Sequence, residues 1–171
     1  MAGIGDILKQ PQLNSLRKTF ESPEGEKQIK TILRGVLPEL YPHSKSYVAA
    51  INSTYFDGAA RRKDPGNLEL DPDDRERCII ALLASQGAQF TLAMHIYLGL
   101  MLGVTPQEIS HVILLSGVYT GAGRFTDGMM VNLKTLQTLA DLTGDLGPAA
   151  ATKALQATFG VSLAPQPQKQ P

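Results

Sequence analysis

The spacing of apolar residues predicts helices along most of the chain. Apolar residues recur at intervals of three and four, which is the periodicity of one helix face. Turn-forming residues divide this pattern into segments. We predict an N-terminal helix within the first 20 residues and further helices over residues 25–40, 44–62, 72–86, 89–102, 106–120, 124–142 and 148–160.

Proline, glycine and capping residues mark the ends of the central helices. Asp71 and Thr105 each precede a proline, and this order is typical of an N-cap followed by the first helical residue. Thr105 and Glu108 also have the spacing of a capping box. Gly87 and Gly103 follow the predicted helix ends. Since no segment shows the two-residue alternation of a strand, the sequence predicts an all-α fold, with residues 72–86 and 89–102 as a central helical hairpin.

The predicted helix over residues 89–102 is apolar on nearly every side, which indicates burial on most sides. Its exceptions are Thr91, His95 and Gly99, which are four residues apart and form one narrow stripe. Ala88 lies at the start of the same stripe. Small residues beside an imidazole leave space, so we interpret the stripe as one wall of a pocket.

Glu76 is a second polar residue on an apolar face, because it shares that face with Ile80 and Leu83. A hairpin across Gly87 would bring Glu76 close to His95. A carboxylate and an imidazole in apolar surroundings can act as a general acid/base pair. Two other interpretations stay open: helix dipoles favour an acid in a first turn, and a lone histidine in an apolar helix is often a hydrogen-bonded core residue.

Length and charge narrow the classes of function. The chain has 171 residues, 43% of them hydrophobic, and a formal net charge of +0. We expect one domain over residues 1–160, followed by a disordered tail rich in proline and glutamine over residues 161–171. The balanced charge argues against a bulk electrostatic nucleic-acid binder. No apolar run reaches the length of a membrane span, so we expect no membrane partner.

The single cysteine and three histidines limit the chemistry further. Cys78 excludes an internal disulfide and a two-thiol redox centre, and we expect it to be a small buried hydrophobe. The first 20 residues lack the pattern of a secretory signal, and we expect a cytoplasmic location. The scattered histidines lack the spacing of metal ligands, so no metal site is expected.

Four features between residues 74 and 125 occur together in a known order. Arg75-Glu76 opens one helix, a histidine follows Glu76 by nineteen residues, "GVTPQEI" spans residues 103–109, and "YTG" spans residues 119–121. This stretch resembles the carboxymuconolactone decarboxylase family, within the alkyl hydroperoxide reductase D-like superfamily. The resemblance implies an all-α, alkyl hydroperoxide reductase D-like fold, usually assembled as trimers or hexamers. We therefore expect a homo-oligomer.

The peroxidase branch of that superfamily is the poorer match. There the resemblance implies a Cys-x-x-Cys motif before the histidine, with a glutamate and the histidine relaying protons to the thiols. The glutamate falls on Glu76 and the histidine on His95, but the cysteine positions fall on Ala88 and Thr91. Without thiols there is no nucleophile to attack a peroxide. An alkylhydroperoxidase-type antioxidant activity is therefore not expected.

The decarboxylase branch also lacks the thiol pair and resembles the chain better. It implies a cofactor-free acid/base enzyme that decarboxylates a small unsaturated lactone or carboxylic acid, or isomerises or cyclises one. On this hypothesis, protonated His95 is the general acid or the charge stabiliser, and Glu76 orients it and helps set its protonation state. The expected substrate-binding residues, which extend the pocket wall, are Ala88, Thr91, Tyr119 and Arg124. Arg124 is a natural partner for a substrate carboxylate, and could equally be a surface cation.

A non-catalytic ligand-binding or scaffolding oligomer is the alternative. It predicts that the space beside His95 is filled and that His95 bonds only to backbone. Catalysis predicts a pocket reachable from solvent, with Glu76 and His95 within hydrogen-bond distance or one water apart.

Overall fold

The computed structural model of the protein describes residues 3–24, 27–28, 31, 46, 70–142 and 146–161. Within them the elements are a 3-10 helix η1 (Ile4–Asp6) and the α-helices α1 (Gln10–Glu21), α4 (Pro72–Gln86), α5 (Gln89–Leu102), α6 (Pro106–Thr120), α7 (Ala122–Asp141) and α8 (Pro148–Thr158). These residues contain no strand, which confirms the predicted all-α class. The helices predicted over 25–40 and 44–62 and the predicted tail over 161–171 lie almost entirely outside the described residues.

Local signals fix the ends of the central helices. Pro72 and Pro106 begin α4 and α6, and Gly87 and Gly103 end α4 and α5 with φ values of 73° and 97°. A residue with a side chain is strained in this left-handed region, so glycine suits both positions. α7 begins at Ala122 instead of the predicted Arg124, because Gly121 both ends α6 and precedes the first turn of α7.

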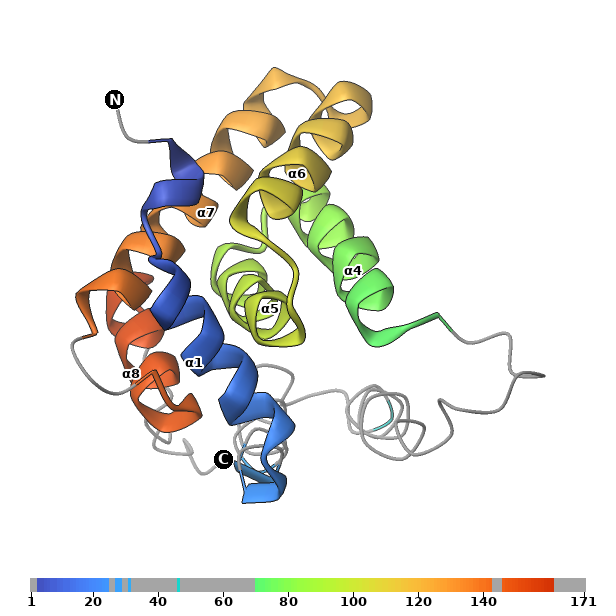
Figure 1. The fold of residues 1–171 in the computed structure, drawn as a ribbon. Coiled ribbons are helices and arrows are strands. Elements are labelled where there is room, and N and C mark those ends of the chain that lie inside the picture. The colour runs from blue at the N-terminus through green and yellow to red at the C-terminus, as the bar shows by residue number, and fades with distance from the viewer. Residues whose placement is uncertain are drawn as a thin grey trace, which may run out of the picture.

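Helix α5 is the centre of the fold. It contacts each of the other described α-helices, and Figure 1 shows it nearly end-on with the others around it. Ten of its residues are buried: Phe90, Leu92, Ala93, Met94, Ile96, Tyr97, Leu98, Gly99, Leu100 and Met101. The prediction that this helix is buried on most sides is therefore confirmed. Across the described residues, no helix has the combination of length and apolar character that crossing a membrane requires.

The predicted hairpin of α4 and α5 is present, but its two helices cross steeply. Glu76 meets His95, and one turn further along α4, Ile80 lies against Gly99, one turn further along α5. In a strictly antiparallel pair, contacts would move backward along one helix as they advanced along the other. Figure 1 shows the same relation, with α4 inclined across the end-on α5. This crossing determines which residues of α4 reach the polar stripe of α5.

Helices α6 and α7 pack closely because glycines lie at their contacts. Gly117 is buried, and a Cβ built on it would lie 2.5 Å from Cβ of Phe125 and 3.2 Å from its Cα. A Cβ built on Gly128 would likewise lie close to the side chains of Ile113 and Ala84. By contrast, a Cβ on Gly123 would meet nothing within 4 Å.

Gly117→Ala is therefore expected to push α6 and α7 apart. Because a backbone atom of Phe125 is among the obstacles, overpacking should lower the free energy of unfolding by about 1–3 kcal/mol. Gly123→Ala is the matched control, and it should leave stability unchanged or raise it by up to about 1 kcal/mol. Urea unfolding followed by circular dichroism measures both variants. Equal effects of the two substitutions would contradict close packing at Gly117.

Candidate functional site

Glu76 and His95 form a hydrogen-bonded pair between α4 and α5. Oε2 of Glu76 lies 2.8 Å from Nδ1 of His95. The glutamate side chain is only 2% exposed and the histidine side chain 16%. The structure thus brings together the two residues that the sequence predicted would meet. Their catalytic role is a separate matter and remains a proposal.

The pattern of α4 explains why a carboxylate points inward. Glu76 lies on the buried face of α4 with Ile80, Leu83 and Ala84. The steep crossing then sets this face against the side of α5 that carries His95. When Glu76 is ionised its carboxylate only accepts hydrogen bonds, and Nδ1 is then the donor in this contact. The Glu76 contact therefore selects the imidazole form that carries a proton on Nδ1.

The other residues of the predicted pocket wall differ in their surroundings. Ala88 and Thr91 are partly buried. Gly99 differs, because Cδ1 of Ile80 would lie 3.3 Å from a Cβ built on it. The space predicted beside Gly99 is therefore filled by Ile80. What remains of the stripe runs from Ala88 to His95.

Arg124 and Tyr119 were both predicted to reach the site, and the structure places them differently. The guanidinium of Arg124 lies over Gly87, where a side chain on the glycine would overlap it. This places Arg124 beside Ala88, at the start of the stripe. Tyr119 is 89% exposed and follows the buried Gly117 by two residues, about 200° around α6. It points away from the core, so one chain does not bring Tyr119 to the Glu76–His95 pair.

Cys78 is exposed, so the expectation of a buried cysteine is wrong. It lies two residues after Glu76, about 200° around α4, and so faces away from α5. Among the described residues, no group of three or more histidine, cysteine, aspartate or glutamate side chains is arranged to hold a metal ion.

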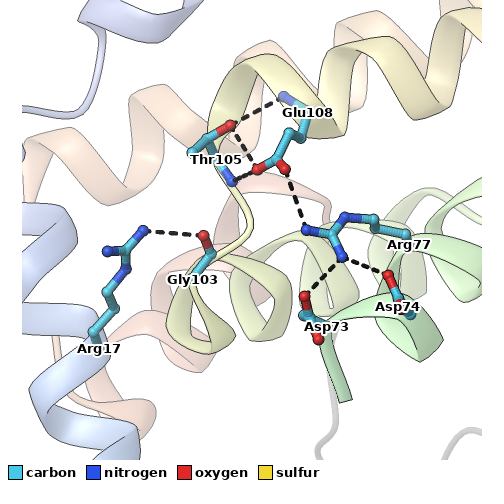
Figure 2. Close-up of polar contacts among 7 residues, drawn as sticks. All are labelled: Arg17, Asp73, Asp74, Arg77, Gly103, Thr105 and Glu108. Carbon is cyan, nitrogen blue, oxygen red and sulfur yellow. Dashed lines mark hydrogen bonds and ion pairs between the residues drawn. The ribbon is translucent and has the colours of Figure 1, made fainter. Parts of the chain in front are cut away.

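A charged cluster at the start of α4 and α6 was not predicted from the sequence (Figure 2). Nη1 of Arg77 donates to Asp73 at 2.8 Å and to Asp74 at 2.7 Å, and Nη2 donates to Glu108 at 3.2 Å. The pairs within α4 have the i, i+3 and i, i+4 spacing that favours ion pairs on a helix, and this signal was available in the sequence. Nothing in the separation of residues 77 and 108 indicates the contact between helices.

Glu108 has two roles in this cluster. Its Oε2 accepts hydrogen bonds from the backbone N–H of Thr105 at 2.7 Å and from the Thr105 hydroxyl at 2.8 Å, while Oε1 accepts from Arg77. The predicted capping box is thus confirmed. The pKa of Glu108 is lowered chiefly by the Thr105 backbone, and further by the Thr105 hydroxyl and Arg77. The pKa of Asp73 is lowered chiefly by its hydrogen bond from Arg77.

Arg17 of α1 holds the adjoining end of α5. Its Nη2 donates to the carbonyl of Gly103 at 3.0 Å, and its guanidinium lies against the same residue. A cation at a helix C-terminus is favoured by the helix dipole. The short segment from Gly103 to Glu108 is therefore bonded to both α1 and α4, as Figure 2 shows.

Comparison with known proteins agrees with the resemblance read from the sequence. Residues 49–131 match the model of the carboxymuconolactone decarboxylase family. The chain carries a carboxymuconolactone decarboxylase family domain. No curated protein and no solved structure matches the chain.

The matched range places the candidate site in the family domain. The carboxymuconolactone decarboxylase family domain includes α4, α5, α6 and about half of α7, and therefore both Glu76 and His95. The matched range begins at residue 49, whereas the stretch that carries the sequence motifs begins at residue 74. The family implies the alkyl hydroperoxide reductase D-like fold, in agreement with the all-α arrangement. Helices α1 and α8 lie outside the matched range.

The charged cluster around Arg77 predicts that the stability of the fold decreases at acid pH. The pKa values of Asp73 and Glu108 are lower in the folded protein than their usual values of 3.8 and 4.5. Their contribution is therefore fully present above those usual values and is lost as the pH falls through the folded values. Glu108→Gln should lower the free energy of unfolding at pH 7 by roughly 0.5–1 kcal/mol.

This difference between the wild type and Glu108→Gln should shrink as the pH falls below 4.5 and through the lowered pKa of folded Glu108, because the wild-type carboxyl becomes neutral as well. Urea unfolding at a series of pH values measures it. A difference that stays constant from neutral to acid pH would contradict the assigned role of the Glu108 charge.

Proposed function

We propose that the protein is a cofactor-free acid/base enzyme of the carboxymuconolactone decarboxylase type. Its substrate would be a small unsaturated lactone or carboxylic acid, which it decarboxylates, isomerises or cyclises. The observation that carries the proposal is the 2.8 Å contact between Oε2 of Glu76 and Nδ1 of His95, with the carboxylate almost fully buried. Membership of the domain in the family supports the same class of reaction.

In the proposed decarboxylation, His95 acts in its protonated form. The bond between a ring carbon and the substrate carboxylate breaks, and CO2 leaves. The electron pair of that bond enters the conjugated lactone, whose carbonyl oxygen takes the negative charge. His95 donates a proton to carbon, becomes neutral and regains a proton from solvent. The net change is the loss of one CO2 and the uptake of one proton.

Each member of the pair has a defined task in this step. Glu76 accepts from Nδ1, so the proton that reaches the substrate leaves from Nε2, on the opposite side of the ring. The carboxylate orients the imidazole and stabilises its cationic form, as an aspartate does for the histidine of a catalytic triad. The apolar residues around the pair strengthen this attraction, because charges interact more strongly where water is excluded.

Arg124 supports a carboxylate-bearing substrate. It lies beside Ala88, and Ala88 and His95 are about 10 Å apart along α5. A small acid lying along Ala88 and Thr91 would extend from the guanidinium toward the imidazole. We therefore keep Ala88, Thr91 and Arg124 as proposed substrate-binding residues. Tyr119 has no proposed contact with substrate in its own chain.

The alternatives are less well supported. A scaffold predicts a filled space beside His95 and an imidazole that bonds only to backbone. Ile80 does fill the space beside Gly99, whereas the His95 ring contacts the Glu76 carboxylate. A thiol peroxidase needs two cysteines, whereas the chain has one, and that cysteine is exposed and faces away from α5. Ligand binding without turnover remains the competing hypothesis that the following experiment addresses.

Turnover of γ-carboxymuconolactone, followed as CO2 release, tests the proposal. The wild type should release CO2, and His95→Ala should lower kcat by about 10²–10⁴-fold, which is the usual contribution of a general acid. Glu76→Gln should lower it less, since an amide oxygen still accepts from Nδ1 but carries no charge. His111→Ala is the matched control, because His111 is exposed on α6, and it should retain wild-type activity.

Full activity in His95→Ala would rule out the assignment of the general acid. If the wild type binds the lactone without consuming it, the ligand-binding alternative is favoured. If neither binding nor turnover occurs, the same assay should be repeated with unsaturated acids and ketones, and isomerisation should be followed by absorbance.

We also propose that the protein assembles as a homo-oligomer, a trimer or hexamer as the resemblance implies. Supporting this, the C-terminal half of α6 exposes four large apolar side chains, and exposed apolar patches often mark an interface. They are Leu114, Leu115, Val118 and Tyr119, and their exposed fractions are 44%, 50%, 69% and 89%.

Val118→Lys should therefore reduce the assembly to smaller species, as measured by light scattering after size-exclusion chromatography. Gln137→Lys introduces the same charge at an exposed position of α7, and it should leave the mass unchanged. A monomeric wild type, or a Val118→Lys variant of unchanged mass, would contradict an interface on α6.

A further inference from the structure

Arg77 and Glu76 are neighbours on α4 but face different surroundings. One residue corresponds to about 100° around a helix. Glu76 accordingly points into the core toward His95, and Arg77 points toward the start of α6, with its side chain 28% exposed. Because both belong to the same helical turn, any shift of that turn moves the core carboxylate and the outer guanidinium together.

The first turn of α4 lacks the usual side-chain cap. Asp71 occupies the N-cap position and makes no hydrogen bond to the turn with its side chain. Arg77 instead holds the acids of that turn, since Nη1 bonds to both Asp73 and Asp74. Figure 2 shows Arg77 between these two acids on one side and Glu108 on the other. Arg77 follows in the next turn with Glu76, so its guanidinium ties the first turn of α4 to the turn that carries Glu76.

Glu108 connects this turn to the start of α6. One of its oxygens bonds to Arg77 and the other to the backbone and hydroxyl of Thr105. Thr105 lies two residues after Gly103, where α5 ends and where Arg17 bonds to the carbonyl. His95 is eight residues before Gly103 on α5. The contacts thus run from the Glu76 turn to the end of the helix that carries His95.

The geometry points to Arg77 as a positioning residue, which holds Glu108 and thereby keeps Oε2 of Glu76 at Nδ1 of His95. This rests on the proposed role of the Glu76–His95 pair, but it concerns the geometry of the pair and not turnover. A hydrogen bond weakens steeply as its length and angle depart from the optimum. A small displacement of the turn of α4 that carries Glu76 is therefore sufficient to loosen the contact.

A merely structural role for Arg77 gives a different expectation. Exposed ion pairs contribute little to stability, and their loss would lower the unfolding midpoint without changing the imidazole of His95. The proton distribution between Nδ1 and Nε2 of His95 separates the two cases. It can be read directly from ¹⁵N chemical shifts of the histidine side chains.

The test uses the full chain with ¹⁵N-labelled histidine, at a pH where His95 is neutral. His43→Gln and His111→Gln assign the remaining signal to His95. The wild-type ring should carry its proton mainly on Nδ1. In Glu108→Gln the ratio of Nδ1–H to Nε2–H should fall by about threefold or more. Glutamine at this position retains the capping box, so the helix start of α6 is preserved.

Asp74→Asn is the matched control, because it removes one charge within α4 and leaves the bonds of Arg77 to Asp73 and Glu108. It should keep the wild-type ratio. Arg77→Met should lower the ratio as Glu108→Gln does, and the Glu108→Gln result stands by itself if Arg77→Met does not fold.

An unchanged ratio in Glu108→Gln, with or without a lower unfolding midpoint, would overturn the proposal. A wild-type ring protonated mainly on Nε2 would also overturn it. Neither outcome depends on whether γ-carboxymuconolactone is turned over, so failure of the proposed reaction and failure of the positioning role remain distinguishable.

Discussion

The fold depends on the need to cover α5 on every side. An apolar helix without a solvent-facing stripe gains stability only when other elements surround it, and each of the other described α-helices contacts it. The polar side chain in its middle, His95, therefore meets whatever the covering helices present. Helix α4 presents Glu76. The hydrophobic requirement that organises the core thus also creates the apolar setting in which a proton can be held between two side chains.

Two kinds of charge lie next to each other on α4. Glu76 is enclosed with one imidazole, whereas Arg77 belongs to an accessible cluster with Asp73, Asp74 and Glu108. Solvent and salt screen the cluster, so each of its pairs is weak alone. The buried pair is screened far less. The accessible cluster is suited to holding a framework in place through several weak bonds, whereas the buried pair keeps most of its electrostatic attraction.

The sequence was informative wherever a local signal decides the structure. The bounds of α4, α5 and α6 follow from prolines, glycines and the Thr105–Glu108 capping box. The shared face of Glu76 and Ile80 indicated which carboxylate turns inward. Properties that arise from packing between helices could not be predicted from the sequence. The steep crossing of α4 and α5 put Ile80 into the space expected beside Gly99. The orientation of Tyr119 depended on which face of α6 is buried, which its apolar sequence does not reveal.

The Glu76–His95 contact also has a consequence for how the chain selects its native packing. An uncompensated charge in a protein interior is costly, so an arrangement that separates the two partners is disfavoured. A slip of α4 by one residue would carry Glu76 about 100° around the helix and out of reach of the imidazole. Purely apolar faces would tolerate such a slip more readily, since one aliphatic side chain can replace another. The Glu76–His95 bond thus also distinguishes one register of α4 on α5 from its near neighbours.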